Sequence, residues 1–137
     1  MFTASCLCGG IQLKLLAPLN PINVCHCKQC QKAQGGAFAA IIQVETKDLE
    51  IVQGEELLQA YFATPNKKRV FCKQCGSSIY SARLDKPEVI RLRAGLINEP
   101  VNVNVISHAY INSKATWDVI GDQAPQYPEA LPATLVK

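Results

Sequence analysis

Seven cysteines among 137 residues constrain this chain more than any other feature, because they fall into three tight clusters. The clusters are Cys6-Leu7-Cys8, Cys25-His26-Cys27-Lys28-Gln29-Cys30 and Cys72-Lys73-Gln74-Cys75. Each has a spacing at which neighbouring sulfurs can reach one metal ion, whereas an odd number of cysteines leaves one thiol unpaired in a fully oxidised chain. The pattern therefore favours metal binding over a disulfide scaffold.

The residues around the cysteines support the same interpretation. A C-x-C segment on a strand places both side chains on one face. A C-x-x-C turn folds back on itself, and Gly9 and Gly76 each follow the second cysteine of their cluster. Glycine allows the left-handed turn that points backbone N–H groups toward the sulfurs.

Counting ligands suggests two sites of different kinds. Cys6, Cys8, Cys72 and Cys75 supply four sulfurs, and Cys25, Cys27 and Cys30 supply three. Structural zinc sites have four protein ligands, whereas catalytic zinc sites keep one position open. We therefore expect two zinc ions, one structural and one catalytic. Other divisions, in which one cluster serves both sites, satisfy the same count.

The rest of the composition limits the cellular setting and the partners. The first five residues form no basic or apolar leader, and no apolar run approaches the roughly 20 residues that span a bilayer. We expect a cytoplasmic protein, whose thiols stay reduced, with no membrane partner. The net charge is only +3 and aromatic residues make up 7% of the chain, which argues against nucleic-acid binding.

The length fits a single domain over residues 1–137, and the apolar pattern predicts a mainly β fold. Short antiparallel sheets tied by zinc would offset the small core of such a chain. One helix is expected at residues 28–34, ended by Gly35. Strands are expected at residues 12–16, 38–44, 49–52, 79–82, 89–94 and 101–106, and residues 57–62 suit either a strand or a helix.

Two expectations concern the C-terminal part. The segment from Ala124 to Pro132 contains three prolines, so we expect it to be extended and to lie over the domain surface. Trp117 is the only tryptophan, and we interpret it as a core anchor.

The cysteine clusters, in this order, resemble those of the glutathione-dependent formaldehyde-activating enzymes, a family that includes centromere protein V. Arg69-Val70-Phe71 before the third cluster, Ser107-His108 and Ala115-Thr116-Trp117 also match the family pattern. The resemblance covers nearly the whole chain and implies a zinc-tied β fold, sometimes called a β-tent. It also implies a structural zinc at Cys6, Cys8, Cys72 and Cys75, and a catalytic zinc at Cys25, Cys27 and Cys30.

The resemblance implies a carbon–sulfur lyase, which joins formaldehyde and glutathione into S-hydroxymethylglutathione or cleaves that adduct. In this hypothesis zinc binds the thiol as thiolate and holds or polarises the aldehyde. The alternative is a non-enzymatic zinc module that binds protein or nucleic acid, which requires His26 or His108 to close the second site.

Several other side chains are candidates for supporting roles. His26 should point away from the metal of its neighbours, because it lies between two ligands. Arg69 lies just before the third cluster and is a candidate to balance the charge of four thiolates. Similar roles are open to Lys28 and Lys73, and Lys32, Lys67 and Lys68 could attract the carboxylates of an acidic thiol.

Overall fold

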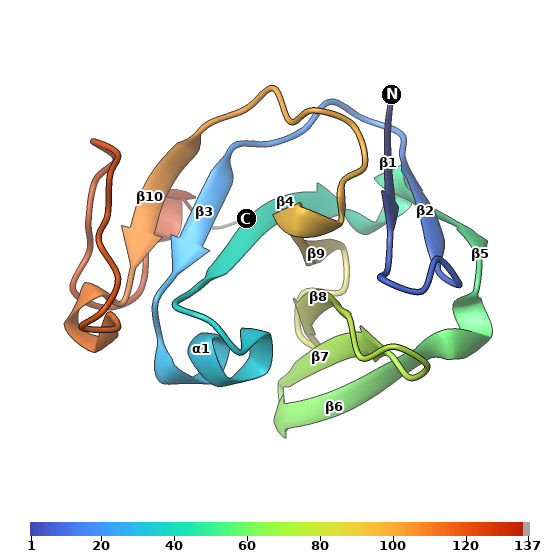
Figure 1. Ribbon diagram of the computed structural model, residues 1–137, viewed down its shortest axis with the longest axis horizontal. Coiled ribbons are helices and arrows are strands. Elements are labelled where there is room, and N and C mark those ends of the chain that lie inside the picture. Colours follow the sequence, from blue (N-terminus) through green and yellow to red (C-terminus); the bar gives the residue numbers. More distant parts are fainter. Residues whose placement is uncertain (136–137) are drawn as a thin grey trace.

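Figure 1 shows the computed structural model of the protein, which describes residues 1–135. A small sheet contains β1 (Phe2–Ser5), β2 (Gln12–Leu15) and β5 (Leu49–Gln53) in that order. The large sheet has the order β10 (Val105–Ala109), β3 (Ile22–Cys25), β4 (Ala39–Glu45), β9 (Val89–Arg93), β8 (Ser78–Arg83), β7 (Lys67–Cys72) and β6 (Leu58–Thr64). The predicted mainly β fold with one helix is confirmed.

The helix α1 (Lys28–Gln34) begins and ends where the sequence predicts. The sulfur of Cys27 caps its first turn by accepting from the Cys30 N–H, at 3.4 Å. Gly35 ends it in the left-handed conformation, at φ 66°, which a glycine adopts without steric cost. Short 3-10 turns lie at Thr46–Asp48, Glu55–Leu57, Ala94–Leu96, Ile111–Ser113 and Ala133–Leu135.

The two faces of the large sheet differ in chemistry. Alternation along each strand sends successive side chains to opposite faces. On one face an apolar row crosses five strands in register, formed by Ile22, Ile42, Leu92, Tyr80 and Val70. On the other face a polar row crosses four strands, formed by Gln43, Arg91, Ser81 and Arg69.

The apolar face packs against the small sheet and forms the core. Leu13 and Leu15 of β2 are buried there with Ile42 and Leu92, and Ile79 of β8 closes the same cluster. Burying apolar side chains between two sheets is the main source of stability in such a layered fold. The polar face is not covered by the small sheet, and α1 lies over one end of it (Figure 1).

Three strands were not predicted from the sequence, and the bounds of a fourth were wrong. The strands β1, β3 and β7 are short or mixed in polarity, so their patterns do not stand out. Residues 101–104 alternate cleanly but form no strand, and β10 starts only at Val105. It pairs with β3 in parallel, which alternation alone does not reveal.

Residues 114–135 form the C-terminal segment, part of which runs beside β10, as the left side of Figure 1 shows. Tyr127 donates its backbone N–H to His108 at 2.8 Å, and Tyr110 donates its N–H to Glu129 at 2.9 Å. The segment thus continues past the edge of the sheet toward the polar face. The expectation for Trp117 was wrong, because its side chain is 71% exposed and anchors no core.

Within residues 1–135 no helix has both the length and the apolar character needed to cross a membrane.

Candidate metal centres

The first candidate centre contains the four sulfurs of Cys6, Cys8, Cys72 and Cys75. All four lie within 4.8 Å of one another, and the sulfurs of Cys6 and Cys8 are 3.5 Å apart. Cys6 and Cys8 belong to the loop between β1 and β2, whereas Cys72 ends β7 and Cys75 lies in the turn before β8. A metal ion here would join the small sheet to the large one.

The turns around this centre have the expected glycine geometry. Gly9 and Gly76 have φ angles of 75° and 80°, which favour glycine. The backbone N–H of Ile11 donates to the sulfur of Cys6 at 3.3 Å. The hydroxyl of Ser77 lies 3.3 Å from the sulfur of Cys75, and this contact lowers the pKa of that thiol to about 5.

The second candidate centre contains Cys25, Cys27 and Cys30. Their sulfurs also lie within 4.8 Å of one another. Cys25 ends β3, Cys27 caps α1, and Cys30 lies in the first turn of the helix. Hydrogen bonds from the Cys25 and Cys30 thiols lower the pKa of Cys27, whereas contacts with the Cys27 and Cys30 sulfurs raise the pKa of Cys25. Among residues 1–135, no histidine, cysteine or carboxylate supplies a fourth donor atom to this group.

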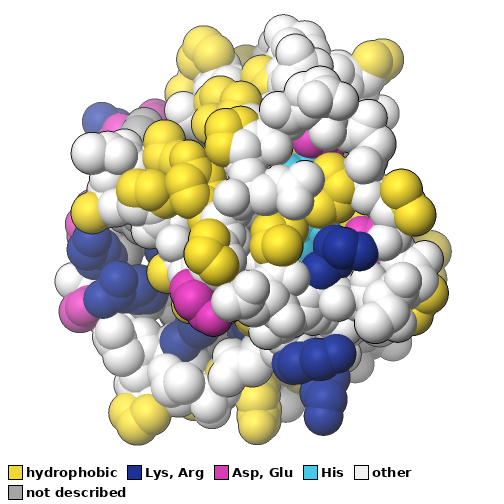
Figure 2. Space-filling model, turned by 90° about the vertical axis from the view of Figure 1, so that its left-hand side faces the viewer, with side chains coloured by type: hydrophobic (Ala, Val, Ile, Leu, Met, Phe, Trp, Pro, Cys, Tyr) yellow, Lys and Arg dark blue, Asp and Glu magenta, His cyan; other side chains and the backbone are white. Residues whose placement is uncertain are grey.

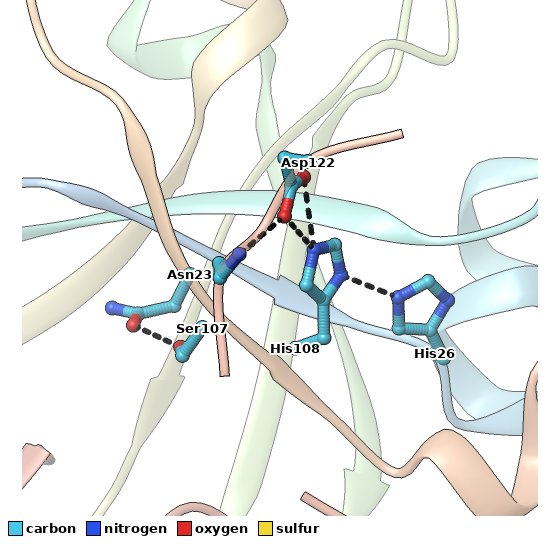
Figure 3. Close-up of polar contacts among 6 residues, drawn as sticks. Asn23, His26, Ser107, His108 and Asp122 are labelled. Atoms are coloured by element: carbon cyan, nitrogen blue, oxygen red, sulfur yellow. Dashed lines mark hydrogen bonds and ion pairs between the residues drawn. The ribbon is translucent and has the colours of Figure 1, made fainter. Parts of the chain in front are cut away.

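Neither histidine closes the second centre. His26 is fully buried, and its Nε2 is 2.9 Å from Nδ1 of His108. Nε2 of His108 contacts the carboxylate of Asp122, with 3.0 Å to each oxygen (Figure 3). Burial lowers the pKa of His26, which favours its neutral form. The closed second site that the binding-module alternative requires is therefore absent from the described residues.

Arginine side chains surround the second centre. Nη2 of Arg69 donates to the sulfur of Cys30 at 3.9 Å. This places Arg69 at the three-sulfur group and not at the four-sulfur group that follows it in the sequence. Arg93 is buried beside it and donates from Nε to Gln34 at 2.9 Å, and burial lowers its pKa to about 10. Arg93 thus remains a cation near neutral pH.

A cavity of about 470 Å³ opens beside Cys25 and Cys30 on the polar face of the large sheet. Its cationic lining residues are Lys67, Arg83, Lys86 and Arg91, and no aspartate or glutamate among residues 1–135 lines it. Arg83 is paired with Asp85 at 2.7 Å. The remaining wall is largely apolar and includes Ala130, Leu131 and Ala133 of the C-terminal segment.

Of the five lysines named as candidates from the sequence, one lines the cavity. Lys67 lines the cavity, and burial followed by the charge of Arg69 lowers its pKa. Lys28, Lys32, Lys68 and Lys73 are not among the lining residues. Arg91 and Arg93 were not predicted, although the alternation of charged and apolar residues in Val89-Ile90-Arg91-Leu92-Arg93 already places both on one face of a strand. Asp122 was not predicted either, and the sequence holds no signal for it.

The donor atoms of both groups suit zinc. Thiolates are soft ligands that suit zinc, and a tetrahedral site needs sulfurs that converge on one point. Both groups meet these requirements with all seven cysteines free of disulfides. The structure therefore contains two cysteine clusters that could each hold a metal ion.

Comparisons with known proteins point in the same direction. A family model described as glutathione-dependent formaldehyde-activating enzyme matches residues 1–113. An uncharacterised lyase of Schizosaccharomyces pombe is 25% identical over 113 residues, covering 82% of this chain and 80% of that protein. A putative glutathione-dependent formaldehyde-activating enzyme of Sordaria macrospora is 26% identical over 83 residues, covering 61% of this chain and 35% of that protein.

A solved structure shares the fold. The crystal structure of a Rhodobacter sphaeroides protein superimposes with a TM-score of 0.60 and is 27% identical in sequence. The match covers 75% of this chain and 98% of that one.

Proposed function

Because this chain belongs to the family of glutathione-dependent formaldehyde-activating enzymes, we propose that it is a zinc-dependent carbon–sulfur lyase. It forms or cleaves an S-hydroxymethyl thiol, with formaldehyde as the aldehyde and glutathione as the first candidate thiol. One observation carries the proposal: a group of three sulfurs lacks a fourth protein donor and adjoins a cation-lined cavity. A closed metal site would leave a substrate thiol no place to bind.

The two cysteine groups have separate tasks in this proposal. Cys6, Cys8, Cys72 and Cys75 hold a structural zinc ion that links the two sheets. Cys25, Cys27 and Cys30 hold the catalytic ion. When bound there, zinc supplies a position at which a thiol loses its proton and becomes a nucleophile.

The reaction itself is a simple addition. The sulfur of the thiol forms a bond to the carbonyl carbon of formaldehyde, and the proton lost by the thiol ends on the former carbonyl oxygen. Cleavage reverses both changes, and nothing is oxidised or reduced. The task of the protein is therefore to bring the thiol and formaldehyde together, to orient them and to ionise the thiol.

Cationic side chains on the polar face attract the acidic thiol to the site. Lys67 and Arg91 line the cavity beside the sulfurs, and Arg69 and Arg93 lie behind them. Three thiolates and one zinc ion carry a net charge of −1, so the four cations leave the region positive. Such a site favours an anionic fourth ligand and attracts the two carboxylates of glutathione.

An exchange measurement tests this function. Formaldehyde adds to thiols without help, so the rate of exchange and not the yield must be followed. Exchange NMR at equilibrium reports how fast glutathione and its hydroxymethyl adduct interconvert. We expect the zinc-loaded protein to raise this rate and the Cys27→Ser variant to lose the effect. Equal rates with the wild type, the variant and no protein would contradict the proposal.

A matched comparison tests the role of the cavity. Replacing Arg91 by glutamine removes one lining charge, whereas replacing Lys68 removes a charge that does not line the cavity. We expect Arg91→Gln to raise the glutathione concentration needed for half-maximal exchange by about tenfold, from the loss of one close charge pair. Lys68→Gln should have little effect.

A further inference from the structure

A buried imidazole lies between two of the candidate ligands and has no part in the proposed reaction. His26 is 0% exposed, and its ring packs against Phe38 with 5.6 Å between ring centroids. Only small areas of the histidines, in cyan, reach the face seen in Figure 2. Burying a polar ring is costly unless it forms hydrogen bonds, so a specific role needs to be found for it.

The ring of His26 ends a chain of hydrogen bonds that starts at the surface. Asp122 contacts His108, and His108 contacts His26, as Figure 3 shows. Asp122 is itself oriented by the backbone N–H of Ala124, which donates to Oδ1 at 2.9 Å. That N–H and His108 lower the pKa of Asp122, which keeps the carboxylate charged.

The hydrogen bonds from Asp122 to His26 fix the proton positions when both rings are neutral. A carboxylate only accepts, so His108 must carry its proton on Nε2. Nδ1 of His108 is then an acceptor, and His26 must donate from Nε2. Nδ1 of His26 is left bare, in agreement with the lack of any hydrogen-bond partner for this buried atom within residues 1–135. Asp122 thus sets the tautomer of both rings.

The backbone of His26 is held as firmly as its ring. Its N–H donates to the carbonyl of Ala109 at 3.0 Å, and its carbonyl accepts from Nε2 of Gln31 at 2.8 Å. The same Gln31 nitrogen also donates to the carbonyl of Ser113 at 2.8 Å. His26 is therefore fixed at three points, while its two neighbours direct their sulfurs to Cys30.

We propose that Asp122 and His108 are positioning residues of the three-sulfur centre, which orient His26 and so hold Cys25 and Cys27 ready for a metal ion. The inference rests on the proposed function, since it assumes that a metal binds there. Asp122 lies beyond residues 1–113 that match the family model. The C-terminal segment of this chain therefore contributes to a site whose ligands all come from the matched region.

The first test observes the proton positions directly. The chain contains only two histidines, so long-range ¹H–¹⁵N spectra of untagged protein show two imidazole spin systems. At pH 8, where an ordinary imidazole is neutral, we expect both rings to be protonated on Nε2. Asp122→Ala should mix the tautomers of His108. A His26 ring protonated on Nδ1 in the wild type would overturn the proposal.

The second test measures metal affinity at each centre by competition with a chelator. Losing a partner that orients a ligand typically weakens metal binding by about 10- to 100-fold. We expect this loss for Asp122→Ala at the weaker, three-sulfur centre, with no change at the four-sulfur centre. Asp118→Ala is the matched control, because Asp118 also places a negative charge near His26 but forms no side-chain hydrogen bond to either ring within residues 1–135.

The outcomes separate the two proposals. If the wild type binds no metal at the three-sulfur centre, the proposed function fails. If the wild type binds metal there and Asp122→Ala binds it within about twofold as tightly, only the positioning role fails. An equal loss at both centres, together with a lower melting temperature, would also overturn it, because a general loss of stability would then explain the data.

Discussion

Arg69 shows how a single residue can be misassigned from sequence alone. It precedes Cys72 by three positions, so we expected it near the four-sulfur centre. On a strand, however, residues three apart point to opposite faces. Cys72 is buried with the core on one face, and Arg69 lies against Cys30 on the other. Sequence distance was a poor guide here, and strand periodicity would have been a better one.

The first prediction follows from this contact. Arg69 is only 8% exposed and its Nη2 lies 3.9 Å from the sulfur of Cys30, so it places a positive charge beside a candidate metal ligand. Replacing it by glutamine should weaken metal binding at the three-sulfur centre by about tenfold or more. Chelator competition measures this, with Lys68→Gln as the control on the same strand. Equal affinities for the two variants would contradict the assigned role of Arg69.

At the scale of elements, the helix and the cysteine turns were the easiest features to predict. The helix has a clear stop at Gly35, and Gly9 and Gly76 follow the two cysteine clusters of the four-sulfur group, where a positive φ is needed. The strands β1 and β3 were missed, because a strand of four residues shows a period only when its polarity alternates as clearly as it does in β2. The parallel pairing of β10 with β3 depends on contacts between distant segments, which local sequence does not encode.

The second prediction separates the tasks of the two centres. Cys75 belongs to the group that joins the two sheets, whereas Cys27 belongs to a local group at the start of α1. Cys75→Ser should therefore lower the melting temperature by roughly 10 °C or more, because metal binding contributes to folding free energy. Cys27→Ser should lose one metal ion with a much smaller change. Similar destabilisation in both variants would argue against a dedicated open centre.

The third prediction concerns the C-terminal segment as part of the cavity. Leu131 lines the same cavity as Lys67, Lys86 and Arg91. Leu131→Glu would place a negative charge where an acidic thiol should bind, and like charges at close range are unfavourable. We expect about tenfold weaker glutathione binding by calorimetry, and little change for Leu131→Met. Unchanged binding in the glutamate variant would place the thiol elsewhere.

At the scale of the whole molecule, one sheet with two different faces explains both stability and function. The apolar face is covered by the small sheet, and the four-sulfur group lies at their junction. The polar face gathers arginine and lysine side chains beside the three-sulfur group. Cysteine spacing was enough to predict both groups of sulfurs. The cavity and its charges depend on strand order, so they became visible only in the folded chain.

The proposed function requires two metal ions in each chain, of which one accepts an outside thiol. Cobalt substitution can measure both features, because sulfur-to-cobalt charge-transfer absorption rises with each thiolate bond. We expect this band to saturate at two cobalt ions per chain, with seven cysteine thiolates bound. Glutathione should then raise the band further, by the contribution of one additional thiolate, and Cys27→Ser should abolish that rise. Saturation at a single cobalt ion, or a band that glutathione leaves unchanged, would show that the open metal site does not exist.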